Sequence, residues 1–187
     1  MRAFIAIKLP PEINASLIKL QHELKLTLPK ISWVKPANLH LTLKFLGEIS
    51  TEQLACAAQK IPEIIKGFSP FEIKLETLGV FPDLSRGRII WIGSQTPDPE
   101  LKRLVGEIEK ELSKIGLPKE KHSFQAHISL GRIKQPLNPL DLECCLKKVW
   151  NDCATLDLKF SAAGITLFKS QLNRQGADYS ILQELNF

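Results

Sequence analysis

The feature that most constrains this chain is a four-residue pattern that occurs twice. His40-Leu41-Thr42-Leu43 returns as His127-Ile128-Ser129-Leu130, at an offset of 87 residues (40 to 127). Because alternate side chains of a β-strand point to opposite faces, each copy places an imidazole and a hydroxyl on one face and aliphatic side chains on the other. The sequence therefore predicts two strands that each present a histidine beside a serine or threonine.

The two patterns belong to a longer internal repeat. Residues 2–7 match 88–93, residues 71–75 match 156–160, and Gly79 matches Gly164, at nearly the same offset and in the same order. Chance similarity within an α+β chain is the alternative, but the matches include polar as well as apolar positions. An internal duplication, with repeats at roughly 2–87 and 88–187, is the better explanation. We therefore expect residues 1–187 to form a single domain of two interleaved, similar lobes that face each other.

The spacing of apolar residues predicts a mixture of helices and strands. Apolar residues at three- and four-residue spacing predict helices at 12–28, 51–67, 98–115 and 140–150. Predicted strands are 4–9, 31–34, a motif strand ending at 47, 71–80, 88–93, 124–133, 156–160, 162–171 and 179–185. Turn-forming residues predict a loop at 82–87, and a polar loop is predicted at 173–176.

Composition excludes several classes of protein. The chain has no apolar stretch of the length a membrane span needs, and its N-terminal apolar run is too short for a signal peptide, so we expect a cytoplasmic location. Its four cysteines lack a Cys-x-x-Cys pair, which argues against zinc and predicts reduced thiols, mostly buried in helices. A net charge of +5 weakly favours an anionic partner such as RNA.

Two histidines at equivalent positions are best explained by acid–base catalysis. Imidazole has a pKa of about 6.5, so one ring can take a proton from an attacking oxygen while the other gives one to a leaving oxygen. The hydroxyls of Thr42 and Ser129 can donate hydrogen bonds to phosphate oxygens, and such a site requires no metal and no cofactor. We expect His22 to be an exposed surface residue, and no ligand pattern supports a metal site at His122.

These motifs resemble those of the two-histidine (2H) phosphoesterase superfamily. The narrower resemblance is to the RNA 2',3'-cyclic phosphodiesterases, first called 2'-5' RNA ligases, and it covers essentially the whole chain. It is carried by Trp33-Val34, by the run from Asn38 to Gly47, and by Gly131-Arg132 after the second pattern. In this sequence Ser129 replaces the commoner threonine, and Ala126 replaces the commoner proline before the second histidine.

The resemblance implies a bilobal α+β fold with antiparallel sheets, helices on their outer faces and the motifs facing across a central cleft. It implies hydrolysis of a 2',3'-cyclic phosphate, at an RNA end or in a nucleotide, to a 2'-phosphomonoester. By this resemblance His40 is the proton donor to the 3'-oxygen, and His127 is the proton acceptor that activates water. Thr42, Ser129 and Arg132 would bind the phosphate. Reversible 2'-5' ligation is a related activity, and no obligate protein partner is evident.

Two questions stay open on the sequence alone. A nucleotide- or RNA-binding module with the same fold but without turnover is the alternative function. Some residues near the motifs could contact RNA, but we expect ordinary solvated charges at four of them and core packing at two aromatic residues. The four cations are Lys35, Lys44, Arg86 and Arg174, and strand alternation places the two aromatic residues, Phe45 and Phe124, with the core.

Overall fold

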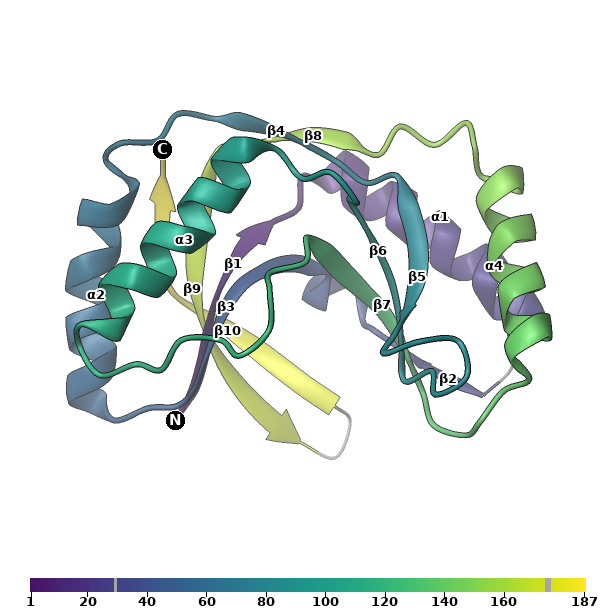
Figure 1. Ribbon diagram of the computed structural model, residues 1–187, viewed down its shortest axis with the longest axis horizontal. Helices are drawn as coiled ribbons and strands as arrows, with labels where there is room; N and C mark the ends of the chain where they lie inside the picture. The colour runs from purple at the N-terminus through teal and green to yellow at the C-terminus, as the bar shows by residue number, and fades with distance from the viewer. Residues whose placement is uncertain (29, 174–175) are drawn as a thin grey trace.

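The computed structural model describes residues 1–28, 30–173 and 176–187, which form antiparallel sheets flanked by helices (Figure 1). In the first half of the chain the elements are β1 (Arg2–Lys8), α1 (Pro11–Thr27), β2 (Ile31–Trp33), the 3-10 helix η1 (Pro36–Asn38), β3 (His40–Glu48), α2 (Thr51–Ile65), β4 (Phe71–Lys74) and β5 (Thr77–Phe81). In the second half they are β6 (Ile89–Gly93), α3 (Pro99–Ser113), β7 (His127–Ile133), α4 (Pro139–Asp152), β8 (Lys159–Ala162), β9 (Gly164–Asn173) and β10 (Gly176–Asn186).

Each large sheet combines strands from both halves of the chain. The first sheet has the order β10-β9-β1-β3, the second has the order β2-β7-β6-β5, and β4 pairs with β8 in a separate ribbon. Strands from the end of the chain therefore complete the sheet that begins with β1, while β2 and β5 complete the sheet built on β6 and β7. Neither half of the sequence could form its sheet alone.

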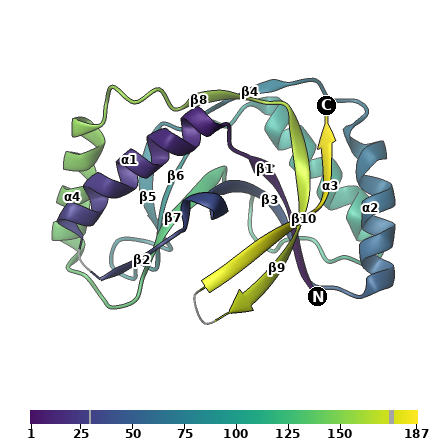
Figure 2. The same cartoon turned by 180° about the vertical axis from the view of Figure 1, so that it is seen from behind.

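Each sheet is likewise flanked by one helix from the first half of the chain and one from the second half. Helices α2 and α3 lie beside the first sheet, whereas α1 and α4 lie beside the second (Figures 1 and 2). Helix α1 follows β1 but is joined to the second sheet by the buried side chain of Gln21, whose Nε2 donates to the carbonyl oxygen of Leu130 at 2.8 Å. The predicted fold class is confirmed: the protein is α+β, bilobal and antiparallel, with helices on the outer faces.

Helices α2, α3 and α4 begin at side-chain caps. The Ser50 hydroxyl accepts a hydrogen bond from the amide of Gln53 at 3.2 Å, and the Gln53 side chain accepts one from the Ser50 amide, which forms a capping box. Asp98 caps α3 and Asn138 caps α4 in the same general manner. Each such cap stabilises its helix by about 1 kcal/mol.

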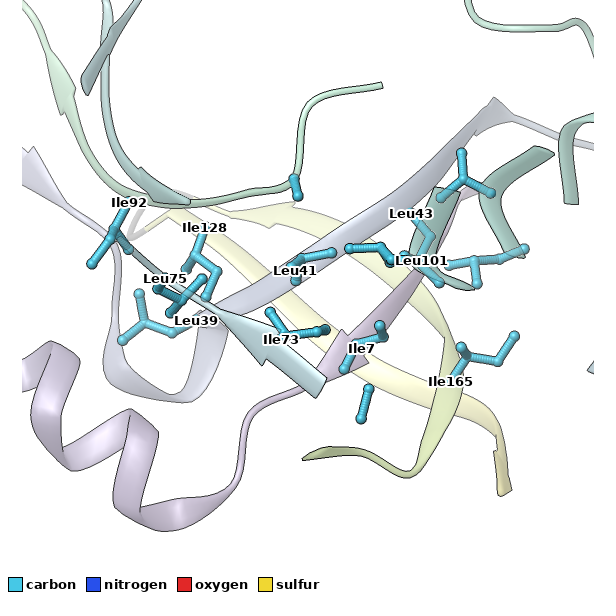
Figure 3. Close-up of a cluster of buried hydrophobic side chains, with 14 of the residues drawn as sticks. Ile7, Leu39, Leu41, Leu43, Ile73, Leu75, Ile92, Leu101, Ile128 and Ile165 are labelled. Atoms are coloured by element: carbon cyan, nitrogen blue, oxygen red, sulfur yellow. The ribbon is translucent and has the colours of Figure 1, made fainter. Parts of the chain in front are cut away.

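One continuous apolar core joins the two sheets. The side chains of Leu39, Leu41 and Leu43 point away from the histidine face of β3 and are buried, as the alternating pattern predicts. Figure 3 shows them in one cluster with Ile128 of β7. The two strands that carry the histidines are therefore packed against the apolar core on the face opposite the histidines.

The prediction of a single strand over 71–80 is wrong. The chain leaves the β4–β8 ribbon at Leu75, whose amide bonds to the carbonyl of Leu158 at 2.9 Å, and joins the second sheet at Glu76, whose amide bonds to the carbonyl of Gly93 at 2.9 Å. Two different pairing partners therefore divide one alternating run into β4 and β5. The predicted polar loop at 173–176 falls partly on residues 174 and 175, which lie outside the described residues.

The thiols are free but not mostly buried. Cys56 of α2 and Cys144 of α4 are exposed, and Cys145 of α4 and Cys153, which follows α4, are partly exposed. Within the described parts of the chain, no three His, Cys, Asp or Glu side chains are grouped so as to hold a metal ion. No helix of residues 1–28, 30–173 and 176–187 is long and apolar enough to cross a membrane.

Candidate active site

Strands β3 and β7 belong to different sheets but lie side by side, and a pocket opens over their polar faces. This pocket encloses about 230 Å³. All five residues singled out from the sequence line it: His40, Thr42, His127, Ser129 and Arg132. The structure thus brings together side chains that are up to 92 positions apart (40 to 132).

The backbone orients both imidazole rings identically. Nδ1 of His40 lies 2.7 Å from the carbonyl oxygen of Asn38, and Nδ1 of His127 lies 2.8 Å from that of Gln125. Because a carbonyl oxygen can only accept, each Nδ1 must carry the donated hydrogen. In the neutral ring Nε2 is then the basic atom. Nε2 of His40 lies 3.0 Å from the Thr42 hydroxyl, so histidine and hydroxyl form one hydrogen-bonded unit.

A stacked aromatic pair supports each imidazole. The His40 ring lies 4.8 Å from Phe4, which stacks on Phe168 at 5.1 Å. The His127 ring lies 4.9 Å from Phe81, edge to face. Phe81 in turn stacks on Trp91 at 4.8 Å. These four aromatic residues come from β1, β9, β5 and β6, so strands of both sheets hold the rings in place.

Burial lowers the pKa of both histidines. For His40 the largest cause is desolvation, opposed by the hydrogen bond to Asn38 and reinforced by repulsion from His127. For His127 desolvation again lowers the pKa, while the hydrogen bond to Gln125 opposes it. The free site therefore favours neutral imidazoles at neutral pH.

A β-bulge at the same position of both motif strands reverses the alternation. Leu43 of β3 has no partner in β1, and Leu130 of β7 has no partner in β6. As a result Phe45 and Arg132, which follow these bulges, join the histidine face instead of the opposite one. Phe45 is 61% exposed and lines the pocket, so the prediction that it packs in the core is wrong. Phe124 does pack against the core, as predicted.

The same bulge buries Lys44, which the sequence suggested would be a solvated charge. Its Nζ lies 2.8 Å and 2.9 Å from the carboxylate oxygens of Glu109 in α3, and 2.8 Å from the carbonyl oxygen of Pro118. The Glu109 carboxylate also accepts from the amide of Glu120 at 3.2 Å. Lys44 therefore fastens the segment that leads into β7 and cannot contact RNA.

The β9–β10 hairpin supplies a wall of the pocket that no motif marked. Gly176, Ala177 and Tyr179 line the pocket, and Tyr179 lies 5.4 Å from the His40 ring, edge to face. The Asn38 side chain donates to the carbonyl oxygen of Ala177 at 2.6 Å. Lys35 is exposed, as predicted, and lies 3.4 Å from Asp178 of the hairpin.

Three remaining predictions concern residues outside this constellation. His22 is exposed, as expected, with 67% of its side chain accessible. His122 is exposed on the segment before β7. Arg174, considered as an RNA contact, lies outside the described residues.

Two strands that each present a histidine beside a hydroxyl meet at one pocket of a bilobal α+β fold, which is the arrangement that the resemblance to the two-histidine phosphoesterases implies. Comparison with protein families gives the same assignment. The family described as LigT-like phosphoesterase matches residues 7–91 and again residues 92–179. The chain belongs to this family.

Similar proteins span nearly the whole chain. The RNA 2',3'-cyclic phosphodiesterase of Methanocaldococcus jannaschii is 34% identical over 185 residues, covering 98% of this chain and 99% of that protein. The protein of the same name from Thermotoga maritima is 28% identical, covering 100% and 96%. Among solved structures, TT0787 of Thermus thermophilus has a TM-score of 0.82 at 24% identity, covering 100% of this chain and 97% of that one. Escherichia coli LigT complexed with 3'-AMP has a TM-score of 0.79 at 24% identity, covering 99% and 97%.

Proposed function

We propose that this protein hydrolyses 2',3'-cyclic phosphates, at RNA ends or in nucleotides, to 2'-phosphomonoesters. The observation that carries this proposal is the pair of imidazoles at one pocket, each with Nδ1 bonded to a backbone carbonyl. Each ring then has only Nε2 available for proton transfer. We infer the substrate from the relatives. A protein named RNA 2',3'-cyclic phosphodiesterase is similar to nearly the whole chain.

Acid and base act on opposite sides of the phosphorus atom. Neutral His127 takes a proton from water as the water oxygen bonds to phosphorus, and protonated His40 gives a proton to the 3'-oxygen as the P–O3' bond breaks. The phosphate remains on the 2'-oxygen. Because the two lobes are alike around the histidines, the orientation of the ribose decides which ring meets the 3'-oxygen, and we assign His40 to it from the family resemblance.

The remaining pocket residues stabilise the charge on the phosphoryl oxygens. Thr42 and Ser129 donate hydroxyl hydrogen bonds, with Thr42 exchanging its contact to His40 for one to the substrate. The Arg132 guanidinium adds a charge-assisted bond and matches the geometry of a phosphate. This scheme uses neither a metal ion nor a cofactor. If a 5'-hydroxyl of RNA takes the place of water, the same steps produce a 2'-5' phosphodiester.

The test is incubation of the purified protein with an oligonucleotide that ends in a 2',3'-cyclic phosphate, with and without EDTA. We expect a 2'-phosphate product, identified by chromatography against authentic 2'- and 3'-phosphates, at a rate that EDTA does not change. Binding without any product would favour the non-catalytic RNA-binding module. A 3'-phosphate product would overturn the assignment of His40, and loss of activity in EDTA would overturn the metal-independent scheme. A cytoplasmic location remains a prediction from the sequence.

A further inference from the structure

A second groove, of about 730 Å³, begins where the active-site pocket ends. It lies between the loop that precedes β6 and the segment that follows β7. Four cationic side chains line it: Arg86, Arg88, Arg132 and Lys134. All four residues are exposed.

The groove carries a strong excess of positive charge. Its lining residues include no aspartate or glutamate. Among the described residues, Arg86 alone of the four cations forms an ion pair, through hydrogen bonds to Asp83 that hold the pKa of that carboxyl well below its usual range. Arg88, Arg132 and Lys134 therefore present charges that no described carboxylate neutralises within ion-pair distance. Cations concentrated in a concave surface attract anions.

Arg132 makes the groove continuous with the catalytic pocket. This side chain lines both cavities. The strand register places Ile89 opposite Arg132, and the amide of Ile133 bonds to the carbonyl oxygen of Arg88 at 2.9 Å. The cations are thus carried by paired backbone segments, and the groove that they line adjoins the active-site pocket at Arg132.

We infer that this groove binds the phosphate backbone of RNA on the 5' side of the cyclic phosphate. The inference rests on the proposed function and narrows its substrate to RNA 3' ends several nucleotides long. A 2',3'-cyclic phosphate closes the 3' end of a strand, so every further phosphate of the substrate lies on its 5' side. Contacts of Arg and Lys to phosphates supply sequence-independent affinity and fix the register of a strand. A mononucleotide would reach Arg132 only.

The test compares a hexanucleotide ending in a 2',3'-cyclic phosphate with a mononucleoside 2',3'-cyclic phosphate. The variant is Arg88→Gln with Lys134→Gln, and the control is Lys66→Gln with Lys102→Gln, which removes equal charge on the α2–α3 side. We expect the groove variant to raise KM for the hexanucleotide about tenfold, with kcat unchanged and the mononucleotide unaffected. Binding of a fluorescent hexanucleotide to the groove variant should also depend less on salt. The slope of log K against log salt concentration should fall in magnitude by about 1.4, which corresponds to two lost phosphate contacts.

Several results would overturn the inference while leaving the proposed function intact. One is that the groove variant and the control raise KM for the hexanucleotide equally. Another is that the groove variant changes KM equally for the hexanucleotide and the mononucleotide. A third is that polyglutamate displaces the labelled RNA as readily as unlabelled RNA does. Hydrolysis of neither substrate would instead contradict the proposed function, and the binding measurements would still test the groove.

Discussion

The ammonium group of Lys44 lies 2.8 Å from the Glu109 carboxylate, in a side chain with no solvent-accessible surface. Lys44 follows the bulge of β3, and Glu109 lies on α3, which packs beside the first sheet. The same ammonium bonds to the carbonyl of Pro118, on the segment that leads toward His127. The pair therefore links β3, which carries His40, to α3 and to the segment that leads into β7.

Loss of one partner should destabilise the protein strongly. We expect Lys44→Met to lower the free energy of unfolding by about 3–5 kcal/mol, because it leaves the Glu109 carboxylate without its buried partner. Adding Glu109→Leu should recover much of that loss. Chemical denaturation of both single variants and the double variant measures the coupling free energy between the two residues. Additive losses would show that the two residues contribute to stability independently.

The histidines should be far more important for turnover than for folding. His40→Ala and His127→Ala should each lower kcat by about 10²–10⁴-fold, the range for a general acid or base. The circular dichroism spectrum should not change, because both rings lie at the pocket rather than in the main core. His22→Ala is the matched control on the surface. A variant that keeps near-normal turnover would remove that histidine from the mechanism.

The hydroxyl at Ser129 should matter more than the size of its side chain. Ser129→Ala should lower kcat at least about tenfold, because one donor to the phosphoryl oxygens is lost. Ser129→Thr should retain most activity, since threonine keeps the hydroxyl. Steady-state kinetics on the cyclic-phosphate substrate distinguishes the two variants, and equal losses in both would indicate a packing role instead.

The pH optimum of kcat/KM should lie below about 6.5, the ordinary pKa of histidine. The proposed mechanism requires one neutral and one protonated ring, and burial lowers the pKa of both in the free protein. A bound phosphate anion favours imidazolium, so the optimum of kcat should lie at higher pH than that of kcat/KM. Both limbs belong to the coupled pair. Coincident optima would show that the substrate does not contact the rings.

Stability should fall as the pH drops below about 6.5. Because the folded-state pKa values are lowered, the unfolded chain binds more protons between the folded pKa and the unfolded value of about 6.5. The free energy of unfolding therefore rises with pH through that window, and this contribution is fully lost below the folded pKa. Denaturation between pH 5 and 7 should show a smaller slope in His40→Gln and His127→Gln. An unchanged slope in both variants would contradict the burial argument.

The local pattern of the sequence predicted the central features of the site. Alternation over three residues places His40 with Thr42 and His127 with Ser129, and the structure has both pairs at one pocket. Each pair needs only a short stretch of strand, which neighbouring residues specify. Membership in the phosphoesterase family and the α+β fold follow from the same motifs.

The alternation fails immediately after the hydroxyls, and sequence alone could not show this. Pairing with β1 leaves Leu43 without a partner and moves Phe45 to the pocket and Lys44 to the interior. The aromatic rings behind the histidines are separated from them in sequence, as Phe4 is from His40, and only strand pairing brings them together.

The sequence by itself determined which chemical groups the two motif strands carry, because a strand sets the direction of adjacent side chains locally. Only the tertiary structure decided what surrounds those groups: the exchanged strands, the bulges, the wall that includes Tyr179 and the basic groove that begins at Arg132. These depend on hydrogen bonds between residues far apart in the chain, and such contacts leave no periodic signal in the sequence.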